Sequence, residues 1–506
     1  MRLTRRSAIR LVGAAATAFS TRLYAQGKLV KEPGKSSTSA LDAANRLVTY
    51  PFPEGLASNP AFVVRVRSAG KQWQDVVPYS MEISKVTAGR SIPQDVSAAY
   101  FDFTGTVEVS ITPASEKIDN VRIRPASLNI AHTVKGNTIT FSLAEPRNLS
   151  VEVNGDIFHN LHLFAGAPET KPVTQSAPNV LYFGPGIHTL TREQGTLASG
   201  QTLYISGGAV VRGAILLDHV ENVRILGRGV LDQSASIKAK NSKNIQISGV
   251  ITAGNMQIGQ CEGFSISNTK TIRSGRWGDG IDFFCCKNVT LENAFLRTSD
   301  DCIAIYGHRW DYYGDTDNIK ISKCILWADV AHPILIGTHG NSDNPNVLEN
   351  ISFHNIDILD QHEEQIDYQG CMSLNAGDSN LIRNVLFEDI RIENFRLGQL
   401  VNLRVFYNKT YNTSPGRGIE GVVFRNVSYS GTHANLSIIA GYDETHKIKN
   451  VVFENLQING VVISDDMADK PRWYKTGDIA GIFIGEHVEG LKFIRERIPS
   501  AATSPN

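Results

Sequence analysis

The sequence lacks a charge excess, a long apolar stretch and helical periodicity. Its 506 residues include 50 basic and 50 acidic residues, so the formal net charge is zero. That balance gives no electrostatic reason to expect nucleic acid or an anionic membrane surface as a partner. Beyond the N-terminus, no run approaches the ~20 apolar residues that a membrane-spanning helix needs. Apolar residues recur mainly at every second position, which favours an all-β chain.

Cysteine is also scarce, and no cysteine has a partner at the spacing of a zinc site. Several of the six lie in apolar, strand-like runs, so buried thiols are expected. A disulfide stays open, because the sequence cannot pair them. No metal or other cofactor is predicted. The six residues are Cys261, Cys285, Cys286, Cys302, Cys324 and Cys371.

The N-terminus has the arrangement of a targeting signal. Arg5 and Arg6 precede an alanine-rich apolar run that ends near Phe19, and Ala25 offers a small residue at a cleavage point. This order resembles a twin-arginine export signal over residues 1–25, which predicts a bacterial protein of the periplasm or the outside. The alternative is a chance pair of arginines in a cytosolic N-terminus. Once the signal is removed, no membrane contact is expected, and polar residues 26–48 are expected to be a linker.

The remaining chain divides into two patterns. Residues 49–170 hold short alternating runs between turn residues, such as 62–67, 107–111 and 149–153. This spacing predicts antiparallel strands in a small β-sandwich. Over residues 171–500 a polar turn with Asn or Gly, followed by a strand, recurs about every 20 to 40 residues, which is the range of solenoid repeats.

Each repeat is too short to bury its own apolar face, so the copies must stack. The sequence therefore predicts a right-handed parallel β-helix preceded by an N-terminal β-sandwich. A β-propeller is the alternative, but its blade signature is missing. Amides at the repeat corners are expected to bond along the stack; they are Asn222, Asn244, Asn288, Asn318, Asn350, Asn384 and Asn450.

Four carboxylates flank one repeat within residues 277–301: Asp279, Asp282, Asp300 and Asp301. Equivalent positions of neighbouring solenoid turns lie ~4.8 Å apart, so these side chains can share one cleft. Asp300 and Asp301 would point to opposite faces of a straight strand, so the backbone is expected to bend there.

Crowded carboxylates can split into a protonated acid and ionised partners, which is what glycoside hydrolysis requires. Two alternatives are ordinary turn residues at solenoid corners and a calcium site.

The order of three motifs resembles the polygalacturonase clan, which comprises glycoside hydrolase families 28 and 49. The motifs are Gly-Asp-Gly around Asp279, Asp300-Asp301, and Thr-His-Gly around His339. The resemblance spans roughly residues 180 to 460 and implies a metal-independent, inverting hydrolase. It implies Asp300 as the general acid, Asp279 and Asp301 as the carboxylates that hold and activate water, and His339 as a supporting residue.

The departures from family 28 concern the substrate. Trp277-Gly278 replaces the Asn-Thr that normally precedes the first Asp, and the Arg-x-Lys that binds a uronate has only Arg404 as a candidate. The sandwich ahead of the β-helix is similar to family 49, so an α-glucan such as dextran or pullulan is favoured. A polygalacturonase- or rhamnogalacturonase-like pectin hydrolase is the alternative. A β-helical lyase or a non-catalytic carbohydrate-binding protein remains open too.

Further residues are candidates for binding a polysaccharide or oligosaccharide. Tyr306, His308 and Trp310 lie directly after the Asp pair and could stack on sugar rings, and Asp282 joins them as a substrate contact. Residues 363–367 form a second acidic group that is expected to be a solvated loop. Nothing in the sequence indicates an oligomeric state.

Overall fold

A computed structural model describes residues 45–495 except 88 and 116. The expected export signal, residues 1–25, and the linker up to residue 44 lie outside the described residues. Strands dominate the described part. Its short helices are α2 (Arg192–Gly195), α3 (Thr476–Ala480) and the 3-10 turns η1 (Ala126–Leu128) and η2 (Ile366–Tyr368). None of the described helices has the length and apolarity to cross a membrane.

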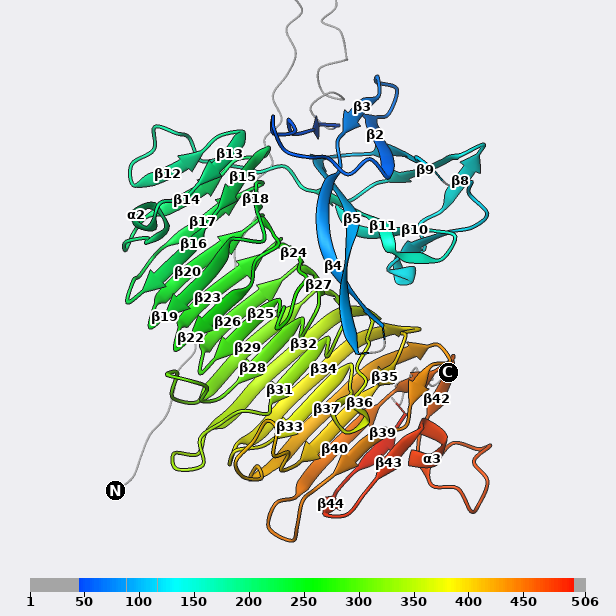
Figure 1. Ribbon diagram of the computed structural model, residues 1–506. Coiled ribbons are helices and arrows are strands. Elements are labelled where there is room, and N and C mark those ends of the chain that lie inside the picture. The colour runs from blue at the N-terminus through cyan, green and yellow to red at the C-terminus, as the bar shows by residue number, and fades with distance from the viewer. Residues whose placement is uncertain (1–44, 88, 116, 496–506) are drawn as a thin grey trace, which may run out of the picture. The chain divides into compact units, whose positions relative to one another are not determined.

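Two facing sheets form the N-terminal sandwich, as the alternating runs predict (Figure 1). One sheet contains β1 (Leu47–Val48), β4 (Tyr79–Thr87), β5 (Arg90–Phe103), β7 (Val121–Arg124), β10 (Arg147–Val153) and β11 (Asp156–Gly166). The other contains β2 (Phe62–Ser68), β3 (Gln74–Val76), β6 (Val107–Pro113), β8 (His132–Lys135) and β9 (Thr138–Leu143). The inward residues of both sheets, such as Val64, Val109 and Leu163, form one buried core.

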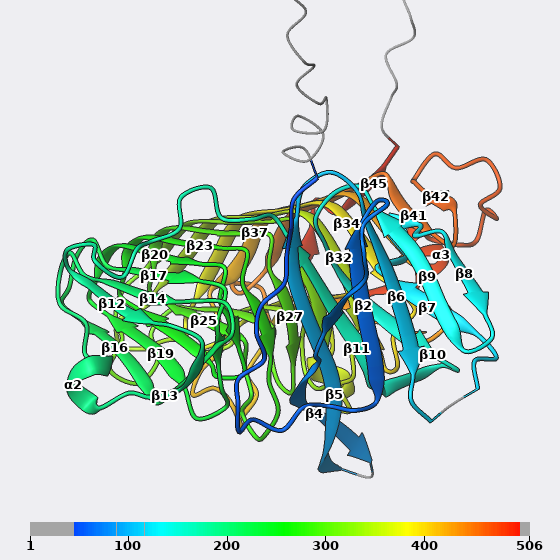
Figure 2. The same ribbon diagram turned by 90° about the horizontal axis from the view of Figure 1, so that it is seen from above.

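Parallel strands then stack along the C-terminal part as a right-handed β-helix, which confirms the predicted fold class (Figures 1 and 2). A ten-stranded sheet carries the site described below. Its strands are β16 (Ala214–Asp218), β19 (Ser236–Lys240), β22 (Met256–Gly259), β25 (Ile281–Phe284), β28 (Ile303–Tyr306), β31 (Ile334–Gly337), β33 (Met372–Ala376), β36 (Val401–Val405), β39 (Ser437–Ala440) and β43 (Ile482–Ile484).

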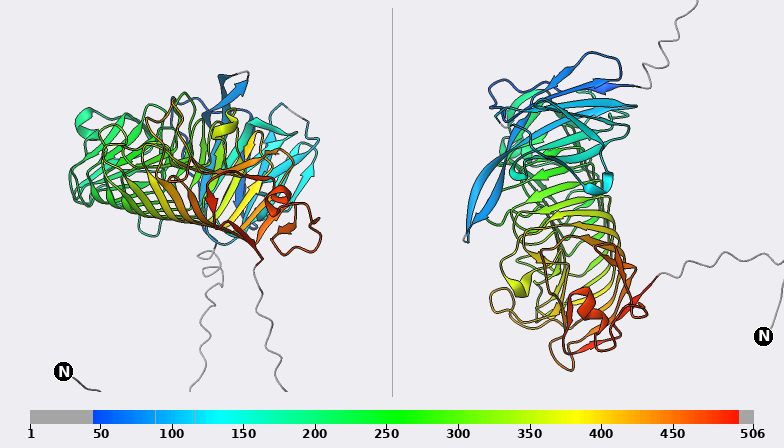
Figure 3. Two further views of the ribbon diagram at one scale, coloured as in Figure 1. Left: turned by 90° about the horizontal axis from the view of Figure 1, so that it is seen from below. Right: turned by 90° about the vertical axis from the view of Figure 1, so that its right-hand side faces the viewer.

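A 22-stranded sheet supplies the remaining faces of the coils. Its strands are β12 (Val180–Phe183), β13 (Gly186–Thr189), β14 (Thr202–Ile205), β15 (Ala209–Arg212), β17 (Arg224–Gly227), β18 (Val230–Leu231), β20 (Lys243–Ser248), β21 (Ile251–Thr252), β23 (Glu262–Ser267), β24 (Lys270–Ile272), β26 (Lys287–Glu292), β27 (Phe295–Thr298), β29 (Thr316–Ser322), β30 (Ile325–Ala328), β32 (Val347–Asp360), β34 (Leu381–Glu393), β37 (Gly418–Ser430), β40 (Ile448–Glu454), β41 (Leu456–Ile458), β42 (Val461–Ile463), β44 (Val488–Glu489) and β45 (Lys492–Ile494). A separate pair joins β35 (Gly398–Gln399) to β38 (Ala434–Asn435). Helices α2 and α3 lie at opposite ends of the stack (Figures 1 and 3).

Strand alternation decides which side chains fill the coil and which face outward. In β25, Ile281 and Phe283 enter the continuous core, whereas Asp282 and Phe284 point away from it. The corner asparagines adopt left-handed backbone angles, for example φ 56° at Asn288 and Asn318. Asn318 Nδ2 donates to Asn288 Oδ1 at 2.7 Å, and Asn244 and Asn384 donate in the same way to Asn222 and Asn350, so the expected amide bonds are confirmed for these three pairs. All six cysteines are buried and free, as expected.

The sandwich packs on the β-helix through strands β4, β5 and β11. Apolar residues such as Met81 and Phe164 join Ile272 and Phe295 in a shared cluster. Fully buried Arg297 binds Asp329 (Nε to Oδ2, 2.8 Å) and also donates to Asn160 Oδ1 of β11 at 2.9 Å. The β4–β5 hairpin runs along the β-helix (Figure 1) and touches the segment before Asp279, because Gly275 N donates to Ser84 Oγ at 3.3 Å.

Candidate active site

Three consecutive coils place one polar residue each at the same position. Asp279, Asp301 and His332 each lie two residues before the start of a strand of the ten-stranded sheet, namely β25, β28 and β31. The first residues of β25 and β28, Ile281 and Ile303, pair with each other, and Ile303 pairs with Ile334. Neighbouring strands of a sheet are ~4.8 Å apart, so the three side chains are stacked neighbours although 53 residues of sequence separate the outer two.

The carboxylates of Asp279, Asp300 and Asp301 form a tight group, with one oxygen atom of each within 4.8 Å of the others. The backbone N–H of Asp301 donates to Asp279 Oδ1 at 3.2 Å and to Asp300 Oδ1 at 3.1 Å. The chain turns here between β27 and β28, and Thr298 Oγ donates to the Asp300 carbonyl at 2.6 Å. The expected bend is therefore present, and it lets both members of the pair reach one site.

Glycines make the close approach of the two coils feasible. A Cβ atom on Gly280 would lie 2.5 Å from the Cys302 carbonyl oxygen, and one on Gly278 would lie 2.1 Å from Ser299 Oγ. At Gly280 the contact is to backbone, so a side chain there would require a backbone shift, whereas at Gly278 the Ser299 side chain would have to move. The Gly-Asp-Gly motif thus presses Asp279 against the Asp300–Asp301 turn.

Burial and mutual repulsion give the carboxyls unequal proton affinities. Burial, followed by the charges of Asp279 and Asp301, raises the pKa of Asp300 well above its usual range. Burial and the charge of Asp301 raise the pKa of Asp279 to about 7. Asp300 is therefore suited to hold a proton near neutral pH, as a general acid must.

His332 is the histidine that contacts the carboxylates. Its Nδ1 lies 2.7 Å from Asp301 Oδ1, and its Nε2 faces the Tyr368 carbonyl. Both partners are acceptors, so both ring nitrogens must carry protons and the ring is an imidazolium. Burial acts to lower the pKa of His332, but the charge and hydrogen bond of Asp301 outweigh it and the net shift is upward.

His339, the residue expected in this supporting role, lies elsewhere. Its Nδ1 contacts the Tyr411 carbonyl at 3.1 Å and its ring packs on Tyr306. No hydrogen bond joins His339 to an aspartate within the described chain. Burial, followed by the charge of Arg309, lowers the pKa of His339 to about 3, so this ring is neutral. It borders the site without touching its carboxylates.

Asp282 points outward from β25 beneath the group and is 2% exposed. Its Oδ1 has no hydrogen-bond partner among the described residues. Burial, then the charges of Asp279 and Asp301, raise the pKa of Asp282 well above its usual range. Asp282 therefore extends the acidic group along β25, and its contact with a sugar stays a prediction.

Aromatic side chains form a layer on the outward face of β25 and β28, next to the carboxylates. Tyr306 at the end of β28 is buried and its hydroxyl donates to Asp301 Oδ2 at 3.4 Å. Phe284 stacks on Tyr306 and Tyr312, with ring centroids 5.4 and 5.1 Å apart. Trp310 covers the edge of this layer and is 57% exposed, so it presents a ring to the solvent. Trp310 remains a candidate for stacking on a sugar ring, whereas Tyr306 is buried and its hydroxyl binds Asp301.

The other two expected substrate contacts lie further out. His308 packs on Tyr313 with ring centroids 4.3 Å apart, and its backbone N–H donates to Asn346 Oδ1. Arg404 on β36 donates to the Asp367 carbonyl at 3.0 Å. Arg404 on β36 pairs in register with Asn375 on β33, and β31 lies between β33 and β28. Arg404 is therefore three strands, or ~14 Å, from Tyr306 at the end of β28.

Two arginines that were not among the expected site residues, Arg309 and Arg273, lie closer to the carboxylates than Arg404 does. Arg309 lies over the rings of Tyr306 and Trp310, at 5.1 and 4.6 Å, and its charge lowers the pKa of both Asp279 and Asp282 against the larger effect of burial. It forms no ion pair among the described residues. Arg273, at the end of β24, acts on the same carboxyls and leaves a buried Nε unpartnered.

The expectation that residues 363–367 form a solvated loop is wrong for Glu363 and confirmed for Glu364 and Asp367. Glu363 is buried at 6% exposure, and its Oε1 accepts the backbone N–H of Gln365 at 2.7 Å. Burial raises the pKa of Glu363, and the charge of His332 opposes this. Glu363 thus belongs to the rim of the site, while Glu364 and Asp367 are exposed.

The three grouped carboxylates are also a set that a hard cation would accept. His332 argues against a metal-centred design, because its imidazolium already supplies a positive charge to Asp301. Acid and base roles can be assigned to the protein's own carboxyls without a metal ion.

Comparison with known proteins gives three findings. Residues 214–471, slightly over half of the chain, match the family described as Glycosyl hydrolases family 28. Endopolygalacturonase D of Aspergillus niger is 22% identical over 370 residues, covering 68% of this chain and 67% of that protein. The polygalacturonase of Chamaecyparis obtusa is 25% identical over 220 residues, covering 41% and 39%.

Among solved structures, Dex49A from Penicillium minioluteum aligns with a TM-score of 0.51 at 13% identity, covering 88% of this chain and 96% of the other. The described β-helix makes up less than two thirds of the chain, so this fold likeness extends into the sandwich. The family match covers the carboxylate group, His332 and the aromatic layer together. The chain belongs to glycosyl hydrolases family 28.

Proposed function

We propose that this glycoside hydrolase cleaves an α-linked, uronate-containing polysaccharide of the pectin class with inversion at the anomeric carbon. The observation that carries the chemistry is the group of Asp279, Asp300 and Asp301, whose oxygen atoms lie within 4.8 Å. Three carboxyls this close cannot all ionise, so they divide into an acid and its ionised partners.

In the proposed reaction, Asp300 donates its proton to the glycosidic oxygen as the bond to the anomeric carbon breaks. A water molecule held by Asp279 and Asp301 attacks that carbon and gives up a proton to one of these carboxylates. His332 is a positioning residue, because its imidazolium holds the Asp301 carboxyl at 2.7 Å.

The choice of a uronan over a glucan rests on charge and on the family. Arg309 offers a guanidinium next to the carboxylates with no ion-pair partner in the described chain, and guanidinium is well suited to bind a sugar carboxylate. The matched relatives are polygalacturonases. The glucan expectation depended on domain layout alone, and the family match supports the pectin alternative better.

Export through the twin-arginine signal is part of the proposal, since it would bring the enzyme to an extracellular polymer. The test is direct. Precursor carrying Arg5→Lys with Arg6→Lys should stay in the cytoplasm of an expressing bacterium, whereas the unaltered precursor should be processed. Equal processing of both would refute this route.

The function is tested by reducing-sugar release from polygalacturonate, rhamnogalacturonan, dextran and pullulan, with EDTA present and Asp300→Asn as the control. Release from a uronan, at least about 100-fold slower in the variant, is expected, because a general acid contributes roughly 10²–10⁴ in rate. Release from a glucan only would contradict the proposed substrate.

Proton NMR of the first product tests the stereochemistry. Inversion at an α-linkage yields the β-anomer first. An initial α-anomer would overturn the water-attack scheme.

A further inference from the structure

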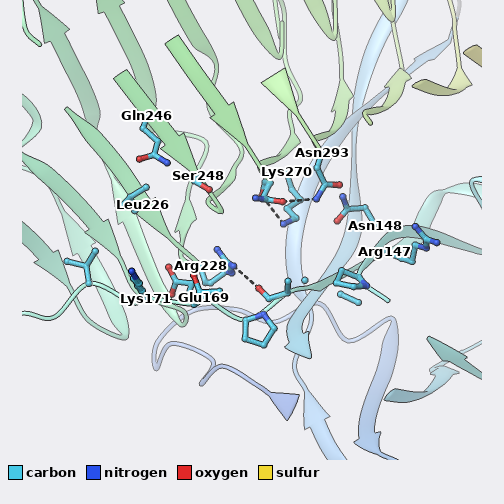
Figure 4. Close-up of a pocket in the computed structure, with 18 residues that line it drawn as sticks. Arg147, Asn148, Glu169, Lys171, Leu226, Arg228, Gln246, Ser248, Lys270 and Asn293 are labelled. Carbon is cyan, nitrogen blue, oxygen red and sulfur yellow. Dashed lines mark hydrogen bonds between the residues drawn. The ribbon is translucent and has the colours of Figure 1, made fainter. Parts of the chain in front are cut away.

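A second polar pocket, of about 470 Å³, lies between the sandwich and the β-helix. The end of β11 and residues 167–171 form one wall, and β17, β20 and β24 form the other (Figure 4). Cations, amides and the carboxylate of Glu169 share its lining, and the cations are Arg147, Lys171, Arg228 and Lys270.

This pocket is separate from the carboxylate site. Lys270 begins β24, and Arg273, whose charge acts on Asp279, follows the end of the same strand. The three residue steps from Lys270 to Arg273 span ~10 Å at about 3.3 Å per residue. Ile272 in that stretch is covered by the sandwich. The two sites are therefore at opposite ends of a covered strand.

Lys270 is the unusual feature of the pocket. Its side chain is more than nine-tenths buried, with 7% of the residue exposed. Nζ donates to the Asn268 carbonyl at 2.8 Å, and no carboxylate of the described chain forms an ion pair with it. Buried charges are normally paired, so an ammonium group held next to a cavity with a single carbonyl partner lacks a counter-charge.

The nearest acids are already engaged. Asp102 Oδ2 accepts Arg228 Nε at 2.8 Å and the Tyr50 hydroxyl at 2.7 Å. Glu169 Oε2 accepts the Tyr204 hydroxyl at 2.6 Å. Burial, and then the charge of Arg228, lowers the pKa of Lys270 to about 8, so the ammonium form still prevails at neutral pH.

We propose that this pocket is a non-catalytic site for the carboxylate of an acidic sugar, anchored by Lys270. Lys171 at the exposed rim adds a second cation, and the amides of Asn148 and Gln246 suit the hydroxyl groups of a sugar ring. The choice of ligand rests on the proposed function, because a uronan chain would present the same carboxylate to both sites.

The test is calorimetric titration of the full-length chain carrying Asp300→Asn with D-galacturonate, D-galactose and sodium sulfate. Lys270→Met in this background keeps the aliphatic stem and removes the charge. We expect galacturonate affinity at this site to fall about tenfold, because the sugar carboxylate loses its charged hydrogen-bond partner. Galactose should bind neither protein measurably.

Matched variants keep the result interpretable. Lys320→Met removes an exposed lysine on β29 and should leave binding unchanged. Lys171→Ala, at the rim, should weaken binding without any risk to folding, which guards against an unfolded Lys270→Met protein. Unchanged galacturonate binding in both pocket variants would overturn the proposal. Sulfate bound as tightly as galacturonate would assign the pocket to inorganic anions instead.

The outcome is separable from that of the proposed function. Lys270-dependent galacturonate binding in a protein that hydrolyses no uronan would keep this site and refute only the proposed activity. Hydrolysis of a uronan without Lys270-dependent binding would do the reverse.

Discussion

His332 Nδ1 and Asp301 Oδ1 are 2.7 Å apart, and both side chains are almost fully enclosed. Asp301 therefore lies against a cation, whereas burial and the charges of Asp279 and Asp301 raise the pKa of Asp300. Two adjacent residues of identical chemistry thereby have different electrostatic environments.

Replacing His332 with alanine is expected to lower kcat/KM by about 100-fold or more, because Asp301 loses the contact that positions it, and positioned acid and base groups contribute roughly 10²–10⁴ in rate. Removing a positive charge from beside the carboxylate group should also move the acid limb of the pH–rate profile to higher pH.

The control is His339→Ala, which removes a neutral ring that touches no described aspartate. It should leave the acid limb in place. Equal displacement of the profile in both variants would show that the His332–Asp301 contact does not set the protonation of the site.

The contact between the sandwich and the catalytic turn predicts a role for Ser84. Its hydroxyl accepts the Gly275 N–H at 3.3 Å, and the Gly275 carbonyl accepts Ser299 Oγ at 2.7 Å, next to Asp300. Ser84→Ala should lower kcat/KM up to about fivefold, since one neutral hydrogen bond contributes about 1 kcal/mol. Ser80→Ala, whose hydroxyl bonds only Asp95 within the hairpin, is the control in the same kinetic assay.

If Ser84→Ala and Ser80→Ala behave alike, the hairpin supports the fold without positioning the catalytic turn. Thermal unfolding of both variants distinguishes this case, because a loss of stability alone would lower the melting temperature without changing the kinetics of the folded protein.

The exposed ring of Trp310 predicts a substrate platform. Trp310→Ala should raise KM about two- to tenfold with little change in kcat, because an aromatic contact contributes roughly 0.5–1.5 kcal/mol to binding. Trp473→Ala is the matched control, since Trp473 is 83% exposed in the segment between β42 and α3. A lower kcat with unchanged KM would instead place Trp310 in the chemical step.

The fold was predictable because its signals are local. Alternating apolar residues and a corner residue with left-handed backbone angles recur in the coils. Asparagine tolerates these angles better than most residues, so Asn288 and Asn318 mark corners in the sequence itself. Asp279 and Asp301 could be grouped for the same reason, since each directly precedes a strand and one coil separates them.

The supporting role was assigned to His339 rather than His332 because the coils differ in length. The step from Asp279 to Asp301 is shorter than the step from Asp301 to His332, since an insertion with Arg309 and Trp310 lengthens that coil. Counting back two residues from each apolar strand, rather than matching a motif, would have found His332. The reach of Ser84 to Gly275 has no local signal, because it depends on how the sandwich packs on the coils.

Asp282 makes a prediction about stability and pH. Because the pKa of Asp282 is raised in the folded protein, the native state keeps a proton that the unfolded chain releases above pH about 4. Stability therefore falls as pH rises from about 4 toward the folded pKa, by about 1.4 kcal/mol per pH unit. Asn cannot ionise, so Asp282→Asn should melt a few degrees above the wild type at pH 7 and lose this advantage at pH 4.

Thermal unfolding at both pH values measures the effect, with exposed Asp343→Asn as a control that should change neither melting temperature. The same gain at pH 4 and pH 7 would mean that the amide simply finds a hydrogen bond that Oδ1 lacks. A gain confined to pH 7 would show that the carboxylate group stores repulsion at the cost of stability, which is the condition that keeps a proton on Asp300.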